Sequence, residues 1–299
     1  MATDELHSVR GGTPPVTEHR SPARVRVIEH RKPGILAALS EVWRFRRFTL
    51  YFGRRFLTKR YGRTWLGFLW LPLRPTLNVG TKLLVFGGVV GITAGNTPYP
   101  VFFLLTSCAW MLFSETVLWS TRSLELNRGL LRDFHVPRLV VICSGIVPGA
   151  IDFAITACIA VAALVYYLIR ANTFYLELTV WSPLTIGTAL LLMAMLGIGV
   201  GLLTASVGAR ARDVRLSLTY GIGFLYFLTP VIYPFESIPD AWKPIAQLNP
   251  VTGALELFKL GLFPNEEISP KAVAITVAAV FALWIPGLWL FQRREVRNQ

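Results

Sequence analysis

The chain has 299 residues, of which 53% are hydrophobic and only 16% are charged, and its mean hydropathy is +0.51. This composition excludes an ordinary water-soluble domain and predicts a polytopic membrane protein. The net charge is +13, but 14 of the 30 basic residues precede Trp65, so the charge bears on membrane topology and does not predict nucleic-acid binding. The three cysteines and four histidines are scattered, without the spacing of a disulfide framework or a zinc site.

The N-terminal part of the chain is polar and precedes any apolar run. Residues 1–33 contain Pro, Thr, Arg and His without periodicity, which predicts a disordered cytoplasmic tail with no signal peptide. In residues 34–65 aromatic side chains recur every three or four positions, at Phe45, Phe48, Phe52 and Phe56. Basic residues flank this stripe, which predicts an amphipathic helix in the inner membrane interface. Apolar residues interrupt its opposite face and leave a contact with protein open, and a simple positive-inside anchor is the alternative.

Six apolar runs in residues 66–299 approach or exceed the roughly 20 residues that a helix needs to cross a bilayer. The expected fold is therefore an all-α integral membrane protein with six transmembrane helices. The runs cover residues 69–92, 101–121, 139–169, 184–207, 216–233 and 272–291. The third is long enough to tilt, to extend beyond the bilayer or to contain an irregular turn.

The loops between these runs alternate in charge. One side of the predicted membrane carries 24 basic residues and the other carries four. Because cytoplasmic loops retain Lys and Arg, this split predicts that the loop 122–138 and both termini are cytoplasmic. The even number of spans agrees with termini on one side.

Residues 234–264, between the fifth and sixth runs, are expected on the external side. The prolines from Pro230 to Pro250 forbid a continuous helix across this region. Asn249 and Pro250 supply an N-cap and a first-turn proline for a short apolar helix, from residue 251 to about 263. This helix is too short to span, so a re-entrant or surface-lying element is expected, with an ordinary external hairpin as the alternative.

Two charged residues on this short helix indicate that the helix moves. Glu256 and Lys259 need one another or water, because ionisable groups are costly in apolar surroundings. We therefore expect the external segment to act as a gate, with a static lid as the alternative. The candidate gate residues are Pro230, Tyr233, Asn249, Pro250, Glu256 and Lys259.

Four charged residues fall within the predicted spans, namely Arg74, Lys82, Glu115 and Asp152. A charge in hydrocarbon requires a partner, water or backbone. At ~1.5 Å per residue, Arg74 lies ~8 Å and Glu115 ~10 Å from the inner ends of their spans, which predicts that they pair. Lys82 and Asp152 both lie ~20 Å from the inner ends, which predicts a second pair. Separate exposure of each charge to a hydrated channel is the alternative.

The sequence contains no signature of catalysis. A phosphate-binding loop of the form G-x-x-x-x-G-K-[ST] is absent, so the chain is not expected to hydrolyse ATP. The G-x-S-x-G and H-E-x-x-H motifs are absent too, and no carboxylates are paired in sequence as an acid and a base. We expect a protein that is not an enzyme and that binds no metal or cofactor itself.

Several short motifs follow one another in a fixed order. Residues 60–75, RYGRTWLGFLWLPLRP, lead into the first run, and residues 127–148, with Phe134, Pro137 and Arg138, connect the second run to the third. Later landmarks are RDV at 212–214, TPVIY at 229–233 and LNP at 248–250. From about Phe45 to the C-terminus, this ordered set resembles the membrane subunits of polysaccharide-exporting ABC transporters. Arg74 departs from the family pattern, which has an apolar residue there.

The resemblance implies a half-transporter of the bacterial cytoplasmic membrane. It would form a homodimer, bind separate ATPase subunits that hold ATP and magnesium, and provide a channel for a lipid-linked polysaccharide. The ATPase is expected to dock on the cytoplasmic loop, at Asn127, Arg128, Arg132, Asp133, Phe134, Pro137 and Arg138. A permease for a drug or a lipid remains an alternative. An ion-coupled carrier is another, although it would show two related halves with interrupted helices, and only one proline-broken region is present.

Aromatic residues near the ends of the spans have two interpretations. They can stack on sugar rings in a channel wall or exit, or they can anchor the chain at the membrane interface. The candidates for a channel wall are Trp110, Phe113, Trp119, Phe224, Tyr226, Phe227, Tyr233 and Trp242.

Overall fold

The computed structural model describes residues 40, 42–62, 64–133, 136–207, 211–263 and 268–297. The chain divides into two units between Pro33 and Gly34, and all the described residues belong to the second, so the predicted tail lies outside them. In these ranges the only β-pairing is an isolated bridge between Ala94 and Thr97, and helices make up most of the remainder. The expected all-α architecture is confirmed.

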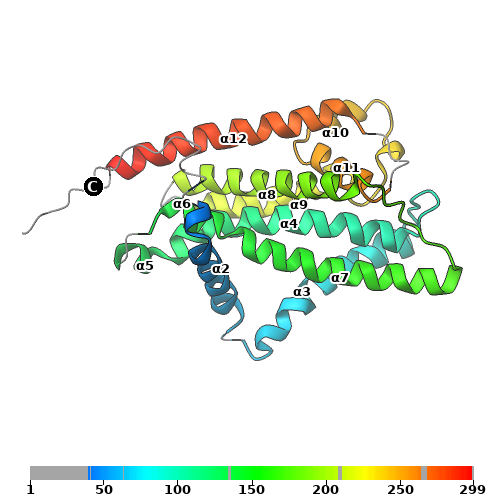
Figure 1. Ribbon diagram of the computed structural model, residues 1–299, viewed down its shortest axis with the longest axis horizontal. Helices are drawn as coiled ribbons and strands as arrows, with labels where there is room; N and C mark the ends of the chain where they lie inside the picture. The colour runs from blue at the N-terminus through cyan, green and yellow to red at the C-terminus, as the bar shows by residue number, and fades with distance from the viewer. Residues whose placement is uncertain are drawn as a thin grey trace, which may run out of the picture. The chain divides into compact units, whose positions relative to one another are not determined.

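Four helical segments in the described part of the chain are long and apolar enough to cross a membrane. Figure 1 shows them running side by side. They are α4 (Tyr99–Leu126), α6 (Arg138–Cys143) with α7 (Ile146–Ala171), α8 (Ser182–Val207) and α12 (Pro270–Arg297). They match the second, third, fourth and sixth predicted runs, and the chain is therefore a multi-pass membrane protein.

The first and fifth predicted runs are helical but shorter or more charged. The first is α3 (Trp70–Leu83), an α-helix of 14 residues that continues as a π-helix over Leu84–Val89. The fifth is α9 (Ala211–Leu228), which has 18 residues and charged side chains in its first turns. Six spans therefore remain a prediction, while four follow from length and composition.

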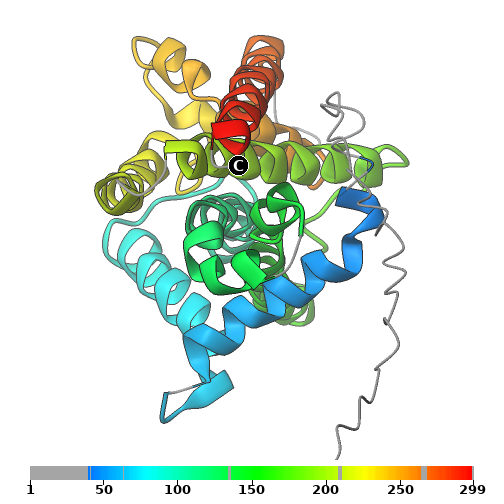
Figure 2. The same cartoon turned by 90° about the vertical axis from the view of Figure 1, so that its left-hand side faces the viewer.

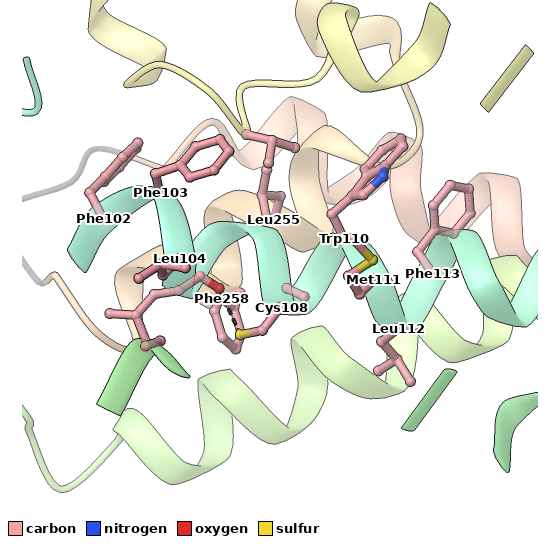
Figure 3. Close-up of a cluster of buried hydrophobic side chains, with 14 of the residues drawn as sticks. Phe102, Phe103, Leu104, Cys108, Trp110, Met111, Leu112, Phe113, Leu255 and Phe258 are labelled. Atoms are coloured by element: carbon pink, nitrogen blue, oxygen red, sulfur yellow. Dashed lines mark hydrogen bonds between the residues drawn. The ribbon is translucent and has the colours of Figure 1, made fainter. Parts of the chain in front are cut away.

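α4 lies at the centre of this helical unit. Within its apolar window 94% of the residues are buried, against 22% for the windows of α6–α7 and α12. Its side chains pack on α7, α8, α9 and α11 (Thr252–Leu260). Figure 3 shows part of this core, with Phe102, Phe103, Trp110 and Phe113 of α4 and Leu255 and Phe258 of α11. α4 buries residues on all its sides, polar as well as apolar, because protein surrounds it on most of its length.

Glycines allow the neighbours of α4 to approach it closely. Gly197 of α8 lies against Thr116, where an added Cβ would come 2.8 Å from the Thr116 Cβ atom. Gly201 lies against Ser120, where an added Cβ would come 2.2 Å from Ser120 Cβ. Gly149 of α7 meets Thr116 in the same way, at 2.6 Å from its Oγ1 atom. Small residues four positions apart let membrane helices pack with their backbones close together.

The third predicted run contains the irregular turn that its length allowed. α6 ends at Cys143, Ser144 and Gly145 form a turn, and α7 begins at Ile146. At the turn the Ser120 hydroxyl of α4 donates a hydrogen bond to the carbonyl of Ile142, at 2.9 Å. α4 therefore supplies a donor where the helix is interrupted.

Short helices collect at the two ends of the long ones (Figure 1). α2 (Arg46–Tyr61), α5 (Arg128–Asp133) and α6 lie at one end, and α10 (Lys243–Leu248) and α11 lie toward the other. Figure 2 views the first end and shows α2 crossing it. The loop predicted to be cytoplasmic and the proline-rich segment predicted to be external therefore lie at opposite ends.

α2 carries the predicted aromatic stripe, and the two halves of the stripe differ. Phe52 and Phe56 are fully buried, because α2 packs on α6 and α7 and reaches α4. Phe45 and Phe48 contact each other and are less enclosed. The second half of the stripe thus faces protein and not lipid. The expected position in the membrane interface remains a prediction for the rest of the helix, which exposes Leu50.

The short helix of the proline-rich segment begins later and ends earlier than predicted. α11 covers Thr252–Leu260, and its N-cap residue is Val251 and not Asn249. Asn249 instead makes two side-chain hydrogen bonds. Its Oδ1 accepts one from the Val251 N–H at 3.0 Å, and its Nδ2 donates one to Thr229 Oγ1 at 2.8 Å. It therefore ties the turn to the end of α9. α4, α8 and α12 pack around α11, so the helix is enclosed by the helical unit, and its place relative to the membrane remains a prediction.

Candidate functional site

A network of ion pairs joins four helices toward the end that carries α2 and α5. Glu115 of α4 lies at its centre with a side chain that is 6% exposed. Arg74 of α3 contacts Glu115 at 2.5 Å through Nη2, and Arg60 of α2 contacts it at 3.4 Å through Nη1. The other terminal nitrogen of Arg74, Nη1, lies 3.3 Å from Asp152 of α7. One set of charges therefore links α2, α3, α4 and α7.

The predicted pair of Arg74 and Glu115 is confirmed, and the predicted pair of Lys82 and Asp152 is wrong. Arg74 binds Asp152 as well, because a guanidinium can serve two carboxylates at once. Lys82 instead lies over the ring of Tyr226 on α9, with Nζ 3.7 Å from the ring centroid. The depth estimate failed because it assumed a continuous helix from the start of α6, and the turn before α7 interrupts that helix.

Aromatic side chains hold Glu115 and Arg60 in place. Trp119, one turn after Glu115, donates from Nε1 to Glu115 Oε2 at 3.0 Å. Phe56 stacks on Trp119 with 5.4 Å between the ring centroids. The Arg60 guanidinium lies 5.3 Å from the ring centroids of both Tyr61 and Trp119. Glu115 thus accepts hydrogen bonds from three side chains, and Arg60 is oriented by two rings as well as by charge.

A cavity of about 360 Å³ opens beside this network, between α2, α3, α4 and α9, and we call it the basic cavity. It is lined by Phe56, Lys59, Arg60, Arg74, Glu115, Leu118, Trp119, Arg122, Leu126 and Thr219. Lys59 donates a hydrogen bond to the carbonyl of Leu126. Burial lowers the pKa of Lys59, and the nearby charge of Arg55 lowers it further.

The loop that follows α4 begins and ends with structural residues. Asn127 is buried and donates from Nδ2 to the carbonyl of Ser123 at 2.8 Å, which closes the end of α4. Pro137 is the N-cap residue of α6, and Arg138 is the first residue of that helix. These three members of the expected docking set therefore position the loop.

The middle of the loop is the exposed part. α5 presents Arg128 and Arg132 to its surroundings and ends at Asp133, before Pro137 as expected. Phe134 and the side chain of Asp133 lie outside the described residues. Arg128 and Arg132 are thus the docking candidates for which the structure provides a surface.

The expected gate residues before α11 take part in hydrogen-bonded turns. Pro230 is buried, and the Tyr233 hydroxyl donates to the carbonyl of Phe227 at 2.8 Å. The carbonyl of Pro250 accepts from Thr276 Oγ1 of α12 at 2.7 Å. These contacts attach the segment to α9 and α12.

Glu256 and Lys259 are enclosed inside the protein, with 2% and 0% of their surface exposed. The Ser269 N–H donates to Glu256 Oε2 at 3.3 Å, and Lys259 Nζ lies 4.9 Å from the ring centroid of Phe102. Movement of α11 would have to break this packing. Gating therefore stays a prediction.

A second cavity, of about 470 Å³, lies toward the opposite end, and we call it the apolar cavity. It is lined by Ile92, Phe227, Leu228, Tyr233, Ser237, Ile238, Pro239, Trp242, Ile245 and Ala246. Three of the predicted channel aromatics, Phe227, Tyr233 and Trp242, thus gather at one place.

Comparison with known proteins identifies the family. The family model described as ABC-2 type transporter matches residues 47–263, from the start of α2 to just beyond α11. The chain belongs to the ABC-2 type transporter family. The matched region contains the ion-pair network, the basic cavity and the α5 loop of this transporter.

Curated relatives of this ABC-2 transporter are named as transport or export proteins. The polysialic acid transport protein KpsM of Escherichia coli is 26% identical over 243 residues, which are 81% of this chain and 91% of that protein. The O-antigen export system permease protein RfbA of Myxococcus xanthus is 23% identical over 266 residues, with 87% and 98% covered. RfbA of Klebsiella pneumoniae is 23% identical over 241 residues, with 81% and 89% covered. The resemblance to permeases of polysaccharide-exporting ABC transporters is confirmed.

Two residues of the network in this ABC-2 transporter were not predicted to belong to it. Arg60 belongs to the basic flank of the aromatic stripe, and Trp119 was considered for a channel wall. The sequence contained a signal for both residues. Arg60 follows Phe56 by four residues and Trp119 follows Glu115 by four, so each pair shares a helix face.

In the described ranges no group of three or more His, Cys, Asp or Glu side chains could hold a metal ion.

Proposed function

We propose that this chain is the membrane subunit of an ABC exporter that moves a lipid-linked polysaccharide across the bacterial cytoplasmic membrane. Two copies form the channel, both termini are cytoplasmic, and separate subunits hydrolyse ATP with magnesium. The observation that carries the proposal is the ABC-2 match over residues 47–263, together with relatives named for polysialic acid transport and O-antigen export. Both named cargoes are polysaccharides.

The geometry supports a path along the seam between α3 and α9. The basic cavity touches both helices at one end of the seam, and the apolar cavity lies by α9 at the other. Between them Lys82 covers the ring of Tyr226, and Phe86 meets Phe227 with 6.2 Å between ring centroids. Separation of these two contacts would join the cavities. A path lined by cations and aromatic rings suits a chain of sugars that carries anionic groups.

The exposed face of α9 supports a second copy of the chain. Leu216, Tyr220 and Phe224 are exposed and recur every four residues. We assign this face to the homodimer, because one chain supplies only one wall of a channel. A Tyr220→Cys variant should crosslink to its own copy in membranes, since a two-fold interface brings equivalent residues together. Val161→Cys, exposed on α7, is the control, and equal crosslinking of both variants would contradict the assignment.

The partner ATPase is assigned to α5. Arg128→Glu combined with Arg132→Glu should reduce co-purification of the ATPase subunit, because it reverses the charge of the exposed surface. Arg170→Glu makes the same type of change in the last turn of α7 and serves as the control. Unchanged co-purification of the ATPase in the α5 variant would reject the docking site.

Export itself is tested in cells that lack the chain. The lipid-linked polysaccharide should accumulate on the cytoplasmic side and disappear from the surface, and the wild-type chain should restore it. Inverted vesicles that also contain the ATPase should take up the polysaccharide only with ATP. Unchanged surface polysaccharide with a changed drug sensitivity or lipid distribution would show that the cargo assignment is wrong.

A further inference from the structure

Lys82 is a charged residue in the middle of the seam between α3 and α9. Residues 75–98, which run from α3 to just before α4, contain no other charged residue, and residues 216–235 on the α9 side contain none. The side chain of Lys82 is half-buried. Among the described residues it forms no ion pair. An ionisable residue inside a membrane protein is costly, so its presence here indicates a function.

An aromatic ring holds the ammonium group of Lys82 in place. Its Nζ atom lies 3.7 Å from the ring centroid of Tyr226. Tyr226 is 3% exposed, and its ring packs against Trp110 of α4 with 5.3 Å between the centroids. An aromatic ring attracts a cation through its negative face but carries no net charge. The contact therefore fixes Lys82 without cancelling its electric field, whereas a carboxylate partner would cancel most of that field.

The remaining charges along the seam leave the path positive. The residues that line the apolar cavity are uncharged. Four basic residues and one carboxylate line the basic cavity, so its lining has an excess of positive charge. The carboxylate is that of Glu115, which Arg60 and Arg74 already bind. A cation that entered from the apolar cavity would therefore meet Lys82 first and further positive charge beyond it.

We propose that Lys82 is an electrostatic barrier that keeps protons and metal cations out of the transport path. The inference rests on the proposed function, because a path that opens wide enough for a chain of sugars also admits small ions. The membrane potential drives cations toward the cytoplasm. A fixed positive charge between walls of low dielectric constant repels them, as cationic constrictions do in channels. Two copies of the chain would place two such charges on the path.

A purely structural role would not require the charge. An apolar side chain of similar length would pack on Tyr226 without the cost of burying an ammonium group. Phe86 and Phe227 also join α3 to α9, with 6.2 Å between their ring centroids. A barrier depends on the sign of the charge at position 82, and a structural contact does not.

The ion selectivity of an opened transporter tests the barrier. The full-length chain is reconstituted with its ATPase in planar bilayers, and Phe86→Ala combined with Phe227→Ala removes the two rings that close the seam beside Lys82. This opened variant should conduct, and its reversal potential in a potassium chloride gradient should show that chloride permeates more readily than potassium. Lys82→Met in the same background should lower the ratio of chloride to potassium permeability about tenfold or more, because it removes the field of a unit charge. Lys82→Arg should keep the ratio. Lys271→Met, the same change at an exposed position on α12, is the control.

Chemical modification varies the charge within a single folded protein. In the opened variant with its native cysteines replaced, Lys82→Cys should lose the preference for chloride. A methanethiosulfonate reagent that adds a trimethylammonium group should restore this preference, and one that adds a sulfonate should favour potassium. Because these measurements use one protein, a difference between the two reagents comes from charge and not from misfolding.

Two results would overturn the barrier. The first is the absence of conductance in the opened variant, which would show that no ion path lies at these contacts. The second is an equal permeability ratio for Lys82→Met and Lys271→Met. If Lys82→Met then still reduced export of polysaccharide, the residue would act on the cargo and not on ions.

An export measurement separates this proposal from the proposed function. If wild-type cells export no polysaccharide through this chain, the proposed function fails, and the bilayer measurement still decides whether Lys82 excludes cations. If export is established and ion selectivity ignores Lys82, only the barrier fails.

Discussion

Arg74 is the residue on which the ion-pair network depends. Its two terminal nitrogens reach carboxylates on two different helices, Glu115 on α4 and Asp152 on α7. Each carboxylate has a side chain that is only 6% exposed, so neither can exchange its partner for bulk water at low cost. A single guanidinium therefore joins α3 to both neighbours.

Replacement of Arg74 by lysine should keep the charge and lose the bridge. One Nζ atom cannot contact both carboxylates as the two guanidinium nitrogens do, so Arg74→Lys should lower the free energy of unfolding by about 1–3 kcal/mol. Thermal unfolding in detergent measures the loss. Arg54→Lys, an exposed position on α2, is the control. An unfolding midpoint for Arg74→Lys equal to that of the control would contradict the bridge.

The two carboxylates should differ in importance. Glu115 accepts from Arg60, Arg74 and Trp119, whereas Asp152 accepts from Arg74. Glu115→Gln should therefore destabilise the protein more than Asp152→Asn, because it removes the charge that serves two guanidinium groups. The two isosteric variants control for each other in the same unfolding measurement. A larger loss for Asp152→Asn would show that the network is not centred on Glu115.

Depth along a continuous helix could be predicted from the sequence, and this is why the contact between Arg74 and Glu115 was foreseen. The contact between Arg74 and Asp152 could not be, because the turn at Ser144–Gly145 separates α6 from α7 and the sequence does not show how α7 is placed after that turn. The direction in which Lys82 points, toward Tyr226, depends on how α3 and α9 are placed side by side. That placement is tertiary information.

At the level of elements, the contact of α8 with α4 depends on the absence of side chains. Gly197 and Gly201 face Thr116 and Ser120 so closely that an added methyl group would overlap them. The sequence shows the glycines and their spacing. It does not show which helix they face, because α4, α7 and α12 are all apolar.

A matched pair of glycines on α8 tests this packing. Gly201→Ala should destabilise the protein by about 1–3 kcal/mol, because the new Cβ would lie 2.2 Å from Ser120 Cβ and one backbone must move. Gly187→Ala, on the same helix with no atom within 4 Å of the new Cβ, should be neutral or stabilising by up to about 1 kcal/mol. The extent of unfolding in a detergent titration compares them. Equal stability of the two variants would show that α4 and α8 are less tightly packed.

The boundaries of α11 illustrate what local signals miss. Asn249 and Pro250 are good N-terminal signals, but Asn249 bonds to Thr229, which lies 20 residues earlier in sequence, and the helix begins only at Thr252. The existence of the helix follows from its apolar residues. Its first residue follows from a partner that the sequence does not reveal.

At the level of the whole molecule, the structure separates the two kinds of loop that the charge count assigned to opposite sides. α5 and α10 lie toward opposite ends of the long helices (Figure 1), and the loop with Asp240 directly precedes α10. The distribution of basic residues predicts which end faces the cytoplasm. The count of basic residues therefore predicts how the protein is oriented in the membrane, which the arrangement of its helices alone does not indicate.

Cysteine labelling in sealed cells tests that orientation. In a protein whose native cysteines are replaced, a membrane-impermeant reagent should label Asp240→Cys and should label Arg132→Cys only after the cells are opened. Asp240 is exposed and paired with Lys243 at 2.7 Å, and Arg132 is exposed on α5, so both sites are accessible from their own side. Labelling of Arg132→Cys in intact cells would reverse the topology.

The bridge made by Arg74 also has a consequence for biogenesis. The chain is synthesised from its N-terminus, and the two partners of Arg74 follow it by 41 and 78 residues. When α3 first meets the bilayer its guanidinium has no carboxylate partner and must be held by water or lipid phosphate. Nascent chains that end before α4 should therefore insert α3 less completely than chains that include it, and Arg74→Leu should remove the difference, as glycosylation mapping in microsomes can measure. Membrane insertion of α3 is therefore completed only when α4 has been synthesised, after α3 has left the ribosome.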